Sequence, residues 1–173
     1  MGSRESGKKE LTAVSLTIQP AAAADRDAVW RVLEPMIRAG ETYPLPRDMS
    51  RGDALAYWFA AAHEVFVARD GDEMVGTYYI RANQKGGGRH VANCGYVAAA
   101  SGRGAGRAMC EHSLARAKAR GFRAMQFNFV VSSNERAVHL WQSCGFAIVG
   151  RLPSAFTHPT LGDVDALVMH RPL

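Results

Sequence analysis

The sequence is poor in cysteine, in clustered histidine and in long apolar runs, and each shortage excludes a class of protein. Its three cysteines, Cys94, Cys110 and Cys144, form no Cys-x-x-Cys pair, which argues against a disulfide framework or a zinc site. The six histidines are scattered, and no two have metal-ligand spacing on one helix face. No apolar run approaches the roughly 20 residues of a membrane span. We therefore predict no metal, no membrane partner and a cytoplasmic location.

Length and composition are those of one globular domain. The chain has 173 residues, of which 47% are hydrophobic, enough for a core of its own. Residues 1–10 are polar and lack the apolar centre of a secretory signal. We predict a flexible tail over residues 1–14 and a single domain over residues 15–173. The net charge of +5 fits either a basic surface or a phosphate-rich cofactor. Nucleic acid is not expected, because no Lys/Arg run is interleaved with aromatic residues.

Hydrophobic periodicity predicts an alternation of strands and helices. Apolar alternation predicts strands at Leu16–Ile18, Val65–Ala68, Met74–Ile80, His90–Ala98, Ala124–Val131, Phe146–Arg151 and Val164–His170. End signals and helical spacing predict helices at Asp25–Ala39, Arg51–Ala62, Arg107–Arg120 and Asn134–Cys144. Pro153 and Pro159 indicate a loop over residues 152–162. This order predicts a mixed α/β sheet with helices on its faces.

A glycine-rich segment, Gly102-Arg103-Gly104-Ala105-Gly106-Arg107, follows a strand and opens a helix. Glycines at such a place let backbone N–H groups converge on an anion, and the helix N-terminus adds positive potential. A diphosphate is the expected ligand. The segment lacks the Gly-Lys-Ser/Thr of a Walker loop and the third glycine of a dinucleotide fingerprint. The alternative is a turn that binds nothing.

A second patterned segment begins at Ser132. Ser132-Ser133-Asn134-Glu135 predicts a capping box with Ser132 as the cap. Apolar residues then recur at helical spacing as Ala137, Leu140, Trp141 and Cys144. Asn134 is placed to reach a ligand from the first turn. Trp141 either lines the same cleft or packs in the core.

Together these residues resemble the GCN5-related N-acetyltransferases over nearly all of residues 16–173. The family's phosphate signature, Gln/Arg-x-x-Gly-x-Gly/Ala, is similar to Ser101-Gly102-Arg103-Gly104-Ala105-Gly106, with Ser101 as a departure. Its second signature is similar to Asn134-x-x-Ala137-x-x-Leu140-Trp141-x-x-x-Gly145-Phe146. The resemblance implies a mostly antiparallel sheet splayed between two central strands. It also implies acetyl-coenzyme A as cosubstrate, no metal, and a homodimer.

The resemblance implies how the cosubstrate lies. Its pantetheine arm would pair with backbone at Tyr96, Val97 and Ala98, where a bulge splays this strand from Ala124–Val131. A backbone N–H near Tyr96 would polarise the thioester carbonyl. The N–H groups of Gly102 to Arg107 would hold the pyrophosphate, and Asn134 and Trp141 would contact the coenzyme.

Trp141 stands where many members of the family carry the tyrosine that protonates the leaving thiolate. An indole N–H is no acid near neutral pH. Direct transfer in a ternary complex would then depend on proximity, worth about 7–11 kcal/mol with the right geometry.

A closer resemblance is to the yeast and fungal acetyltransferases of L-azetidine-2-carboxylate and proline analogues. It rests on Asn93-Cys94-Gly95-Tyr96-Val97, Phe127-Asn128-Phe129-Val130-Val131 and the segment from His158 to Ala166. It implies that Asn93 and Asn128 bind or orient the acceptor; the alternative is that they satisfy backbone groups at the splay. Glu41, Thr42 and Tyr43 would lie on the loop over the acceptor pocket. Glu41 is either a base or ammonium anchor or a solvated carboxylate.

Three functions remain open from the sequence. The first is N-acetylation of a small amine, such as an amino acid or a proline-like analogue. The second is acetylation of a protein N-terminus or lysine, which needs an open groove that the loops at Glu41–Pro46 and at residues 152–162 would close. The third is a non-catalytic acyl-coenzyme A-binding module, because a fold does not guarantee an activity.

Overall fold

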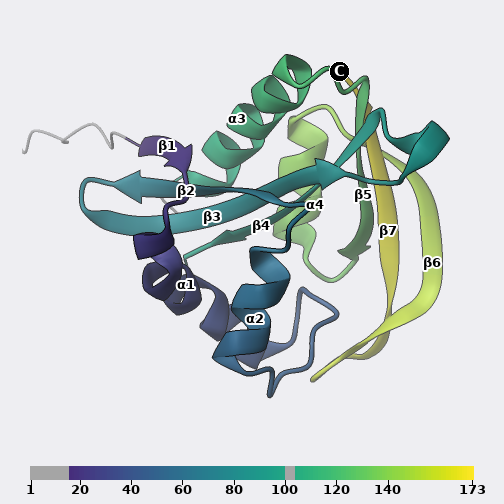
Figure 1. The fold of residues 1–173 in the computed structure, drawn as a ribbon. Helices are drawn as coiled ribbons and strands as arrows, with labels where there is room; N and C mark the ends of the chain where they lie inside the picture. The colour runs from purple at the N-terminus through teal and green to yellow at the C-terminus, as the bar shows by residue number, and fades with distance from the viewer. Residues whose placement is uncertain (1–15, 100–103) are drawn as a thin grey trace, which may run out of the picture.

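A single sheet organises the computed structural model, which describes residues 16–99 and 104–173. In these ranges its seven strands are β1 (Leu16–Pro20), β2 (Glu64–Asp70), β3 (Glu73–Ala82), β4 (Val91–Ala98), β5 (Ala124–Val131), β6 (Ala147–His158) and β7 (Gly162–Pro172). They lie in the order β1-β2-β3-β4-β5-β7-β6 (Figure 1), and β4–β5 is the parallel pair. The expected mixed, mostly antiparallel α/β fold is confirmed. The tail at residues 1–14 and the loop residues Gly102 and Arg103 lie outside the described residues.

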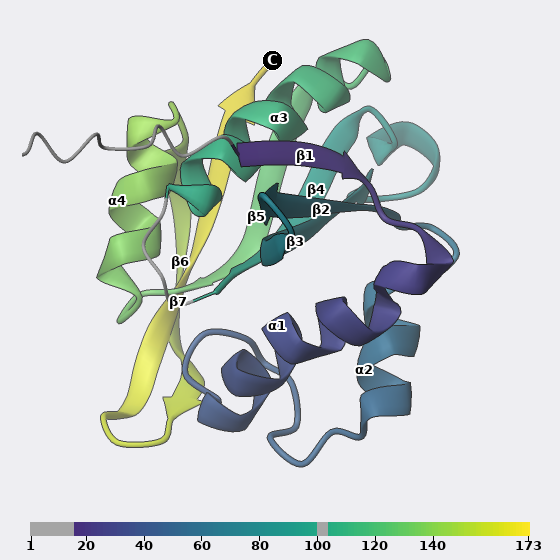
Figure 2. The same cartoon turned by 90° about the vertical axis from the view of Figure 1, so that its left-hand side faces the viewer.

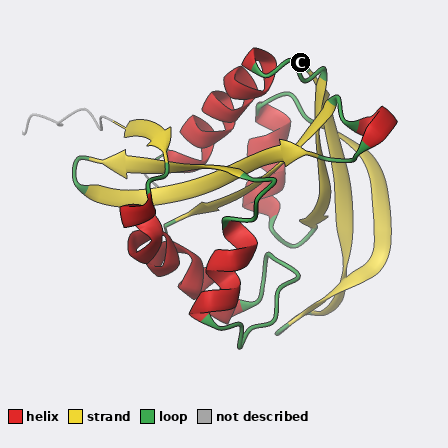
Figure 3. Cartoon of the chain, viewed as in Figure 1, coloured by secondary structure: helices red, strands yellow, loops and turns green. Residues whose placement is uncertain are grey.

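Helices cover both faces of the sheet. They are α1 (Arg26–Ala39), α2 (Arg51–Trp58), α3 (Ala105–Ala119) and α4 (Glu135–Ser143), with short 3-10 turns at Ala23–Asp25 and Gly86–Gly88. Figure 2 shows α1 and α2 on one side of the sheet and α3 and α4 on the other, and Figure 3 shows the loops that join them. Two hydrophobic clusters match this division, one under α3 and α4 and one under α1 and α2. We call the second side the α1/α2 face.

Buried polar contacts fix α2 against the sheet. The indole N–H of the fully buried Trp58 donates to the hydroxyl of Thr77 (3.0 Å), which in turn donates to the carbonyl of Phe66 (2.8 Å). Each partner satisfies a group that would otherwise be buried at a cost of about 1–3 kcal/mol. This arrangement holds the end of α2, and the turn that follows it, in a defined place on the α1/α2 face.

The sheet opens between β4 and β5. In the described chain these strands pair at Val91 with Ala124 and at Ala92 with Met125, and no register partner follows. The resemblance implied a bulge on the β4 side, and this is corrected. The β3–β4 ladder runs without a shift over its described length, whereas the β5–β7 ladder shifts between Phe127 and Val130. One extra residue on β5 is a bulge, which bends the strand and re-aims its side chains.

The segment predicted as a loop at residues 152–162 is largely strand. β6 continues through Pro153 to His158, and β7 begins at Gly162. Proline is tolerated there because β6 is an edge strand and its ladder shifts between Leu152 and Phe156. This segment is therefore a hairpin at the edge of the sheet, so it does not support the expected closed acceptor pocket.

The predicted capping box at Ser132 is wrong by two residues. The N-cap of α4 is Asn134, whose side-chain oxygen accepts the N–H of Ala137 at 3.3 Å. The backbone at Ser132 still pairs with β7, because its N–H donates to the carbonyl of Asp165. The carbonyl end of the Asn134 amide is thus engaged, whereas its NH2 end has no hydrogen-bond partner among residues 16–99 and 104–173.

Two expectations drawn from scarce residues can be compared with the structure. All three cysteines lie in the described ranges, where they are free and buried. None of the helices within residues 16–99 and 104–173 has the length and apolar character of a bilayer-crossing segment.

Candidate functional site

The backbone of β4 presents polar groups to the opening. Asn83 donates its N–H to the carbonyl of Val91, and Ala99 donates its N–H to the carbonyl of Val75. Backbone groups alternate along a strand, so odd-numbered residues of β4 face β3. Tyr96 and Ala98 then direct their N–H and C=O groups toward β5, beyond the last β4–β5 pair.

The same alternation separates the three predicted pantetheine contacts. Val97 lies opposite Thr77 and directs its backbone groups at β3, so it leaves the set that can pair with a ligand in the opening. The carbonyl of Tyr96 accepts the hydroxyl of Tyr43 at 3.1 Å. The N–H of Tyr96 and the backbone of Ala98 remain as the groups that face the opening.

The start of α3 offers further N–H groups beside the opening. The first intrahelical bond runs from Ala108 to Gly104, so the N–H groups of Ala105, Gly106 and Arg107 precede the ladder. As described, the first turn holds no acidic residue. The guanidinium of Arg107 points away to α4, where it donates to the hydroxyl of Ser143 at 2.8 Å.

Two glycines shape this turn. Gly104 has φ +76°, and nothing described lies within 4 Å of a Cβ built on it. A Cβ on Gly106 would lie 3.0 Å from Cδ2 of Leu140, so α3 and α4 approach closely here. An extended strand edge next to a helix N-terminus free of acid suits a long ligand with a pyrophosphate. Gly102 and Arg103, also predicted to bind it, lie outside the described residues.

An amide cluster lies beside the opening on the α1/α2 face. The side chain of Asn93, only 7% exposed, donates to the carbonyl of Gln126 (2.9 Å). The side chain of Gln126 donates to Oδ1 of Asn128 (2.9 Å), and Nδ2 of Asn128 donates to Oδ1 of Asn83 (2.6 Å). The structure thus brings Asn93 and Asn128 together through Gln126. Each has a backbone or side-chain partner and keeps one N–H free for a further one.

Three tyrosines lie next to these amides. The hydroxyls of Tyr57 and Tyr79 are 3.3 Å apart, and that of Tyr43 reaches the carbonyl of Tyr96. The ring of Tyr79 covers Gly95, since a Cβ built there would lie 2.6–2.8 Å from its atoms. Burial, and next the neighbouring phenols, raise the pKa of Tyr43 and of Tyr79 above the ordinary value. Both stay protonated. Tyr43 donates to the carbonyl of Tyr96, and either hydroxyl can be the donor in the Tyr57–Tyr79 contact.

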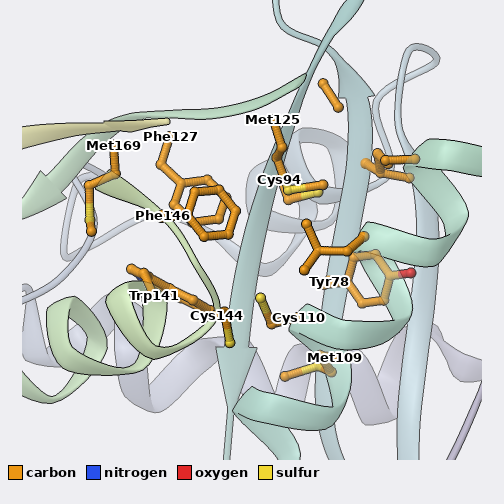
Figure 4. Packing of buried hydrophobic residues seen from close by; sticks show 14 of the residues in the cluster. Tyr78, Cys94, Met109, Cys110, Met125, Phe127, Trp141, Cys144, Phe146 and Met169 are labelled. Atoms are coloured by element: carbon orange, nitrogen blue, oxygen red, sulfur yellow. The ribbon is translucent and has the colours of Figure 1, made fainter. Parts of the chain in front are cut away.

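Trp141 packs in the core beneath the opening. It is 9% exposed, and its ring centroid lies 4.9 Å from that of Tyr96 and 5.2 Å from that of Phe127. Figure 4 shows it in the cluster with Phe127, Phe146 and Cys144. The packing alternative for Trp141 accounts for these contacts. Through its ring, α4 supports the Tyr96 segment of β4 from below.

Among the described residues, Glu41 forms no hydrogen bond or ion pair with the amide cluster, and no metal-ligand group is found near it. Glu41 is exposed and has no hydrogen bond or ion pair to another described residue. Within the described ranges no group of three or more His, Cys, Asp or Glu side chains could hold a metal ion.

Sequence reasoning missed four residues of this face: His63, Arg81, Asn83 and Gln126. Tyr79, Arg81 and Asn83 alternate along β3 and its end, so they share a face. That alternation was readable, but its alignment with Asn93 required the β3–β4 register, in which Arg81 lies opposite Asn93.

Comparisons with known proteins agree with this geometry. Residues 30–146 match the model of the acetyltransferase (GNAT) family. An N-acetyltransferase of Schizosaccharomyces pombe, aca1, is 26% identical over an alignment of 137 positions, which covers 69% of this chain and 66% of that protein's length.

Solved structures with the same fold cover nearly the whole chain. A GCN5-related N-acetyltransferase from Kribbella flavida is 40% identical, with a TM-score of 0.87 over 91% of this chain and 98% of that one. A putative acetyltransferase from Salmonella typhimurium, yncA, with its cofactor acetyl-CoA, is 20% identical, with a TM-score of 0.79 over 92% and 94%. The second likeness concerns the fold alone.

Proposed function

The chain belongs to the acetyltransferase (GNAT) family, whose donor is acetyl-CoA, and on that premise we propose that it acetylates the amine of a small molecule, an amino acid or a proline-like analogue. The observation that carries the proposal is the amide cluster around Asn93 and Asn128. It lies on the α1/α2 face, next to the strand segment whose Tyr96 N–H faces the opening. Neutral amides at that place can orient a polar acceptor without changing its charge.

The donor would lie along the opening. The backbone of Tyr96 and Ala98 and the N–H groups of Ala105 to Arg107 would hold it, with the free amide N–H of Asn134 nearby. When bound, acetyl-CoA supplies the activated acetyl thioester. The N–H of Tyr96 would donate to the oxygen on which negative charge develops, a role worth about 3–4 kcal/mol in other acyl transfers. Trp141 provides no acid, so the amine itself supplies the proton that the thiolate takes.

The loop at Glu41–Pro46 supports a small acceptor over a protein chain. Tyr43 on this loop bonds to Tyr96 and contacts Trp58 at 6.4 Å between ring centroids. The loop is thus fastened across the α1/α2 face. An open groove for a peptide would require these contacts to break.

The test is an acceptor screen in which the release of free coenzyme A thiol is measured. We expect free amino acids and cyclic imino acids to stimulate release, and peptides with free N-termini or lysines to be poor acceptors. Preference for peptides would favour the protein-acetyltransferase reading. No release with any amine, despite acetyl-CoA binding, would favour the non-catalytic module.

Asn128→Ala tests the role of the cluster. We expect kcat/KM for the acceptor to fall at least tenfold, because the orienting amide is lost, while the Kd for acetyl-CoA stays within twofold. Equal loss of both would indicate that Asn128 only maintains the fold. Gln142→Ala, at an exposed position on α4, is the matched control and should change neither.

The expected homodimer and cytoplasmic location stay predictions. The edge strand β6 exposes Ile148, Val149 and Leu152, an apolar strip of the kind that buries itself against a second copy. Light scattering at micromolar concentration measures the oligomeric state directly.

A further inference from the structure

His63 has a defined tautomer and a free ring nitrogen. Its Nδ1 lies 2.9 Å from the carbonyl oxygen of Trp58. A carbonyl oxygen can only accept, so Nδ1 carries the hydrogen and Nε2 carries a lone pair. Within residues 16–99 and 104–173, no donor lies within hydrogen-bond distance of that nitrogen. His63 therefore has the form of a proton acceptor.

The ring of His63 is held in place against β3, on the α1/α2 face. It stacks on the phenol of Tyr79 with centroids 3.9 Å apart and planes 6° apart, and it meets Tyr57 edge-on at 6.1 Å. Tyr79 in turn covers Gly95, the neighbour of Tyr96. The ring of Tyr79 thus contacts both the imidazole of His63 and Gly95 of β4, the strand that borders the opening.

Burial, helped by the charge of Arg81, favours the neutral form of His63. Burial, and next the nearby Arg81 guanidinium, lower the pKa of His63 below its ordinary 6.5, while the bond to Trp58 acts in the opposite sense. The groups around the ring are Tyr57 and Tyr79, both phenols, and Arg81. At neutral pH the imidazole is ready to take a proton.

Arg81 brings an unbalanced positive charge to the same place. It lies between Tyr79 and Asn83 on one face of β3 and opposite Asn93 on β4. It is half-buried, and its side chain makes one hydrogen bond to a described residue, a long contact of 3.4 Å to the carbonyl of Ala82. Within residues 16–99 and 104–173 no carboxylate pairs with it, whereas Arg69 and Arg116 each have one at 2.6–2.7 Å. A half-buried guanidinium without an acid suits an incoming anion.

We propose that Arg81 binds a carboxylate of the acceptor and that Nε2 of His63 accepts the proton that the acceptor's ammonium group gives up. The inference rests on the proposed function and assigns the residues that would recognise the carboxylate and the ammonium group of an amino-acid acceptor. In an amino acid the carboxylate and the ammonium group are separated by one carbon. Here Arg81 and His63 share the α1/α2 face, because His63 stacks on Tyr79 and Arg81 follows Tyr79 two residues later on the same side of β3.

Acetyl transfer moves two protons from the acceptor's ammonium group. One N–H proton of the ammonium passes to Nε2, and the amine lone pair attacks the thioester carbonyl carbon. The new N–C bond forms as the C–S bond breaks, and the sulfur leaves with the bonding electron pair. The thiolate takes the second proton of the amine, and His63 returns its proton to solvent.

Arg81 is tested with matched pairs of acceptors, each an amino acid and its carboxamide. Arg81→Gln should raise the KM for the carboxylate member at least tenfold and leave the carboxamide within twofold, and Arg81→Lys should recover part of the loss. Arg120→Gln, which removes a surface partner of Glu64, is the control and should not alter the preference. An equal effect on both members of a pair would overturn the assignment of Arg81.

His63→Asn tests the proton acceptor, because its amide N–H can still donate to the carbonyl of Trp58. We expect kcat to fall about 10²-fold or more, and the rise of kcat/KM through a pKa below 6.5 to disappear. Acetyl-CoA affinity should be unchanged. A retained acidic limb would refute the role of His63.

Different outcomes refute the proposed function and the roles of Arg81 and His63. If the wild-type protein releases no thiol with any amine, the proposed function is wrong. If it acetylates carboxamides as well as carboxylates, the proposed function stands and the inference about Arg81 is wrong.

Discussion

Gly95→Ala should disrupt the site through a single methyl group. A Cβ built on Gly95 lies 2.6 Å from Cε1, 2.7 Å from Cζ and 2.8 Å from the hydroxyl oxygen of Tyr79. These atoms cannot move away easily. Tyr79 is 5% exposed, stacks on His63, meets Trp58 edge-on at 5.0 Å and contacts the hydroxyl of Tyr57.

The magnitude follows from what must shift. Overpacking a well-filled core costs about 1–3 kcal/mol, and loss of the Tyr57–Tyr79 hydrogen bond adds about 1 kcal/mol. We therefore expect the free energy of unfolding to fall by about 2–4 kcal/mol. With a urea m-value of about 2 kcal/mol/M, the midpoint should move down by about 1–2 M. Because His63 rests on Tyr79, kcat should fall as well.

Urea unfolding followed by tryptophan fluorescence measures this change, with Gly150→Ala as the control. A Cβ on Gly150 would meet Val168 at 3.6 Å, an ordinary contact, so its effect should stay within about 0.5 kcal/mol. A double-mutant cycle with Tyr79→Ala isolates the clash. If Gly95→Ala costs as much without the Tyr79 ring as with it, the reasoning is refuted.

Three further predictions concern the donor site, the core and pH. Gly104→Val should raise the Kd for acetyl-CoA at least tenfold. The control is Gly71→Val at the β2–β3 turn, where the glycine has a similar positive φ and open surroundings; it should lose comparable stability, about 1–2 kcal/mol, with an unchanged Kd. Equal effects of the two variants on acetyl-CoA binding would count against the loop assignment. Trp141→Phe should keep most activity, whereas Trp141→Ala should lower the free energy of unfolding by about 3–5 kcal/mol in urea; a large kcat loss in a stable Phe variant would point to a chemical role. The pKa of His63 and of His112 is lowered below 6.5, with burial as the largest cause. Because the unfolded state then binds more protons, the free energy of unfolding should fall as the pH drops below about 6.5. Removing both imidazoles should flatten this pH dependence in urea titrations.

Much of the fold was predictable because local signals and tertiary structure agree. The turn at Gly71 and the helix end at Gly40 both have positive φ, at +58° and +66°, as their glycines predict. The exceptions depend on neighbours in space. Pro153 is compatible with a strand because β6 lies at an edge. α4 begins only after Asn134, because the backbone of Ser132 is still paired with Asp165 on β7.

The site was predictable in part. Asn93 and Asn128 were found by resemblance, and the structure brings them to one cluster, although nothing yet tests their roles. Arg81 needed the β3–β4 register before it could be placed opposite Asn93. His63 follows a helix that ends four residues earlier than expected, and its tautomer depends on the carbonyl of Trp58. No local pattern carries that information.

The two-pair junction of β4 and β5 has a consequence for stability. The sheet consists of a block from β1 to β4 and a block from β5 to β7, and their ladder stops after Ala92 and Met125. Acetyl-CoA lying along that opening, as proposed, would make hydrogen bonds to the backbone where β4 and β5 make none to each other. Acetyl-CoA binding would then add to the free energy of unfolding, by about 2.7 kcal/mol when the free acetyl-CoA concentration is a hundred times its Kd. If acetyl-CoA lies there as proposed, the protein should resist unfolding best in cells that are rich in acetyl-CoA.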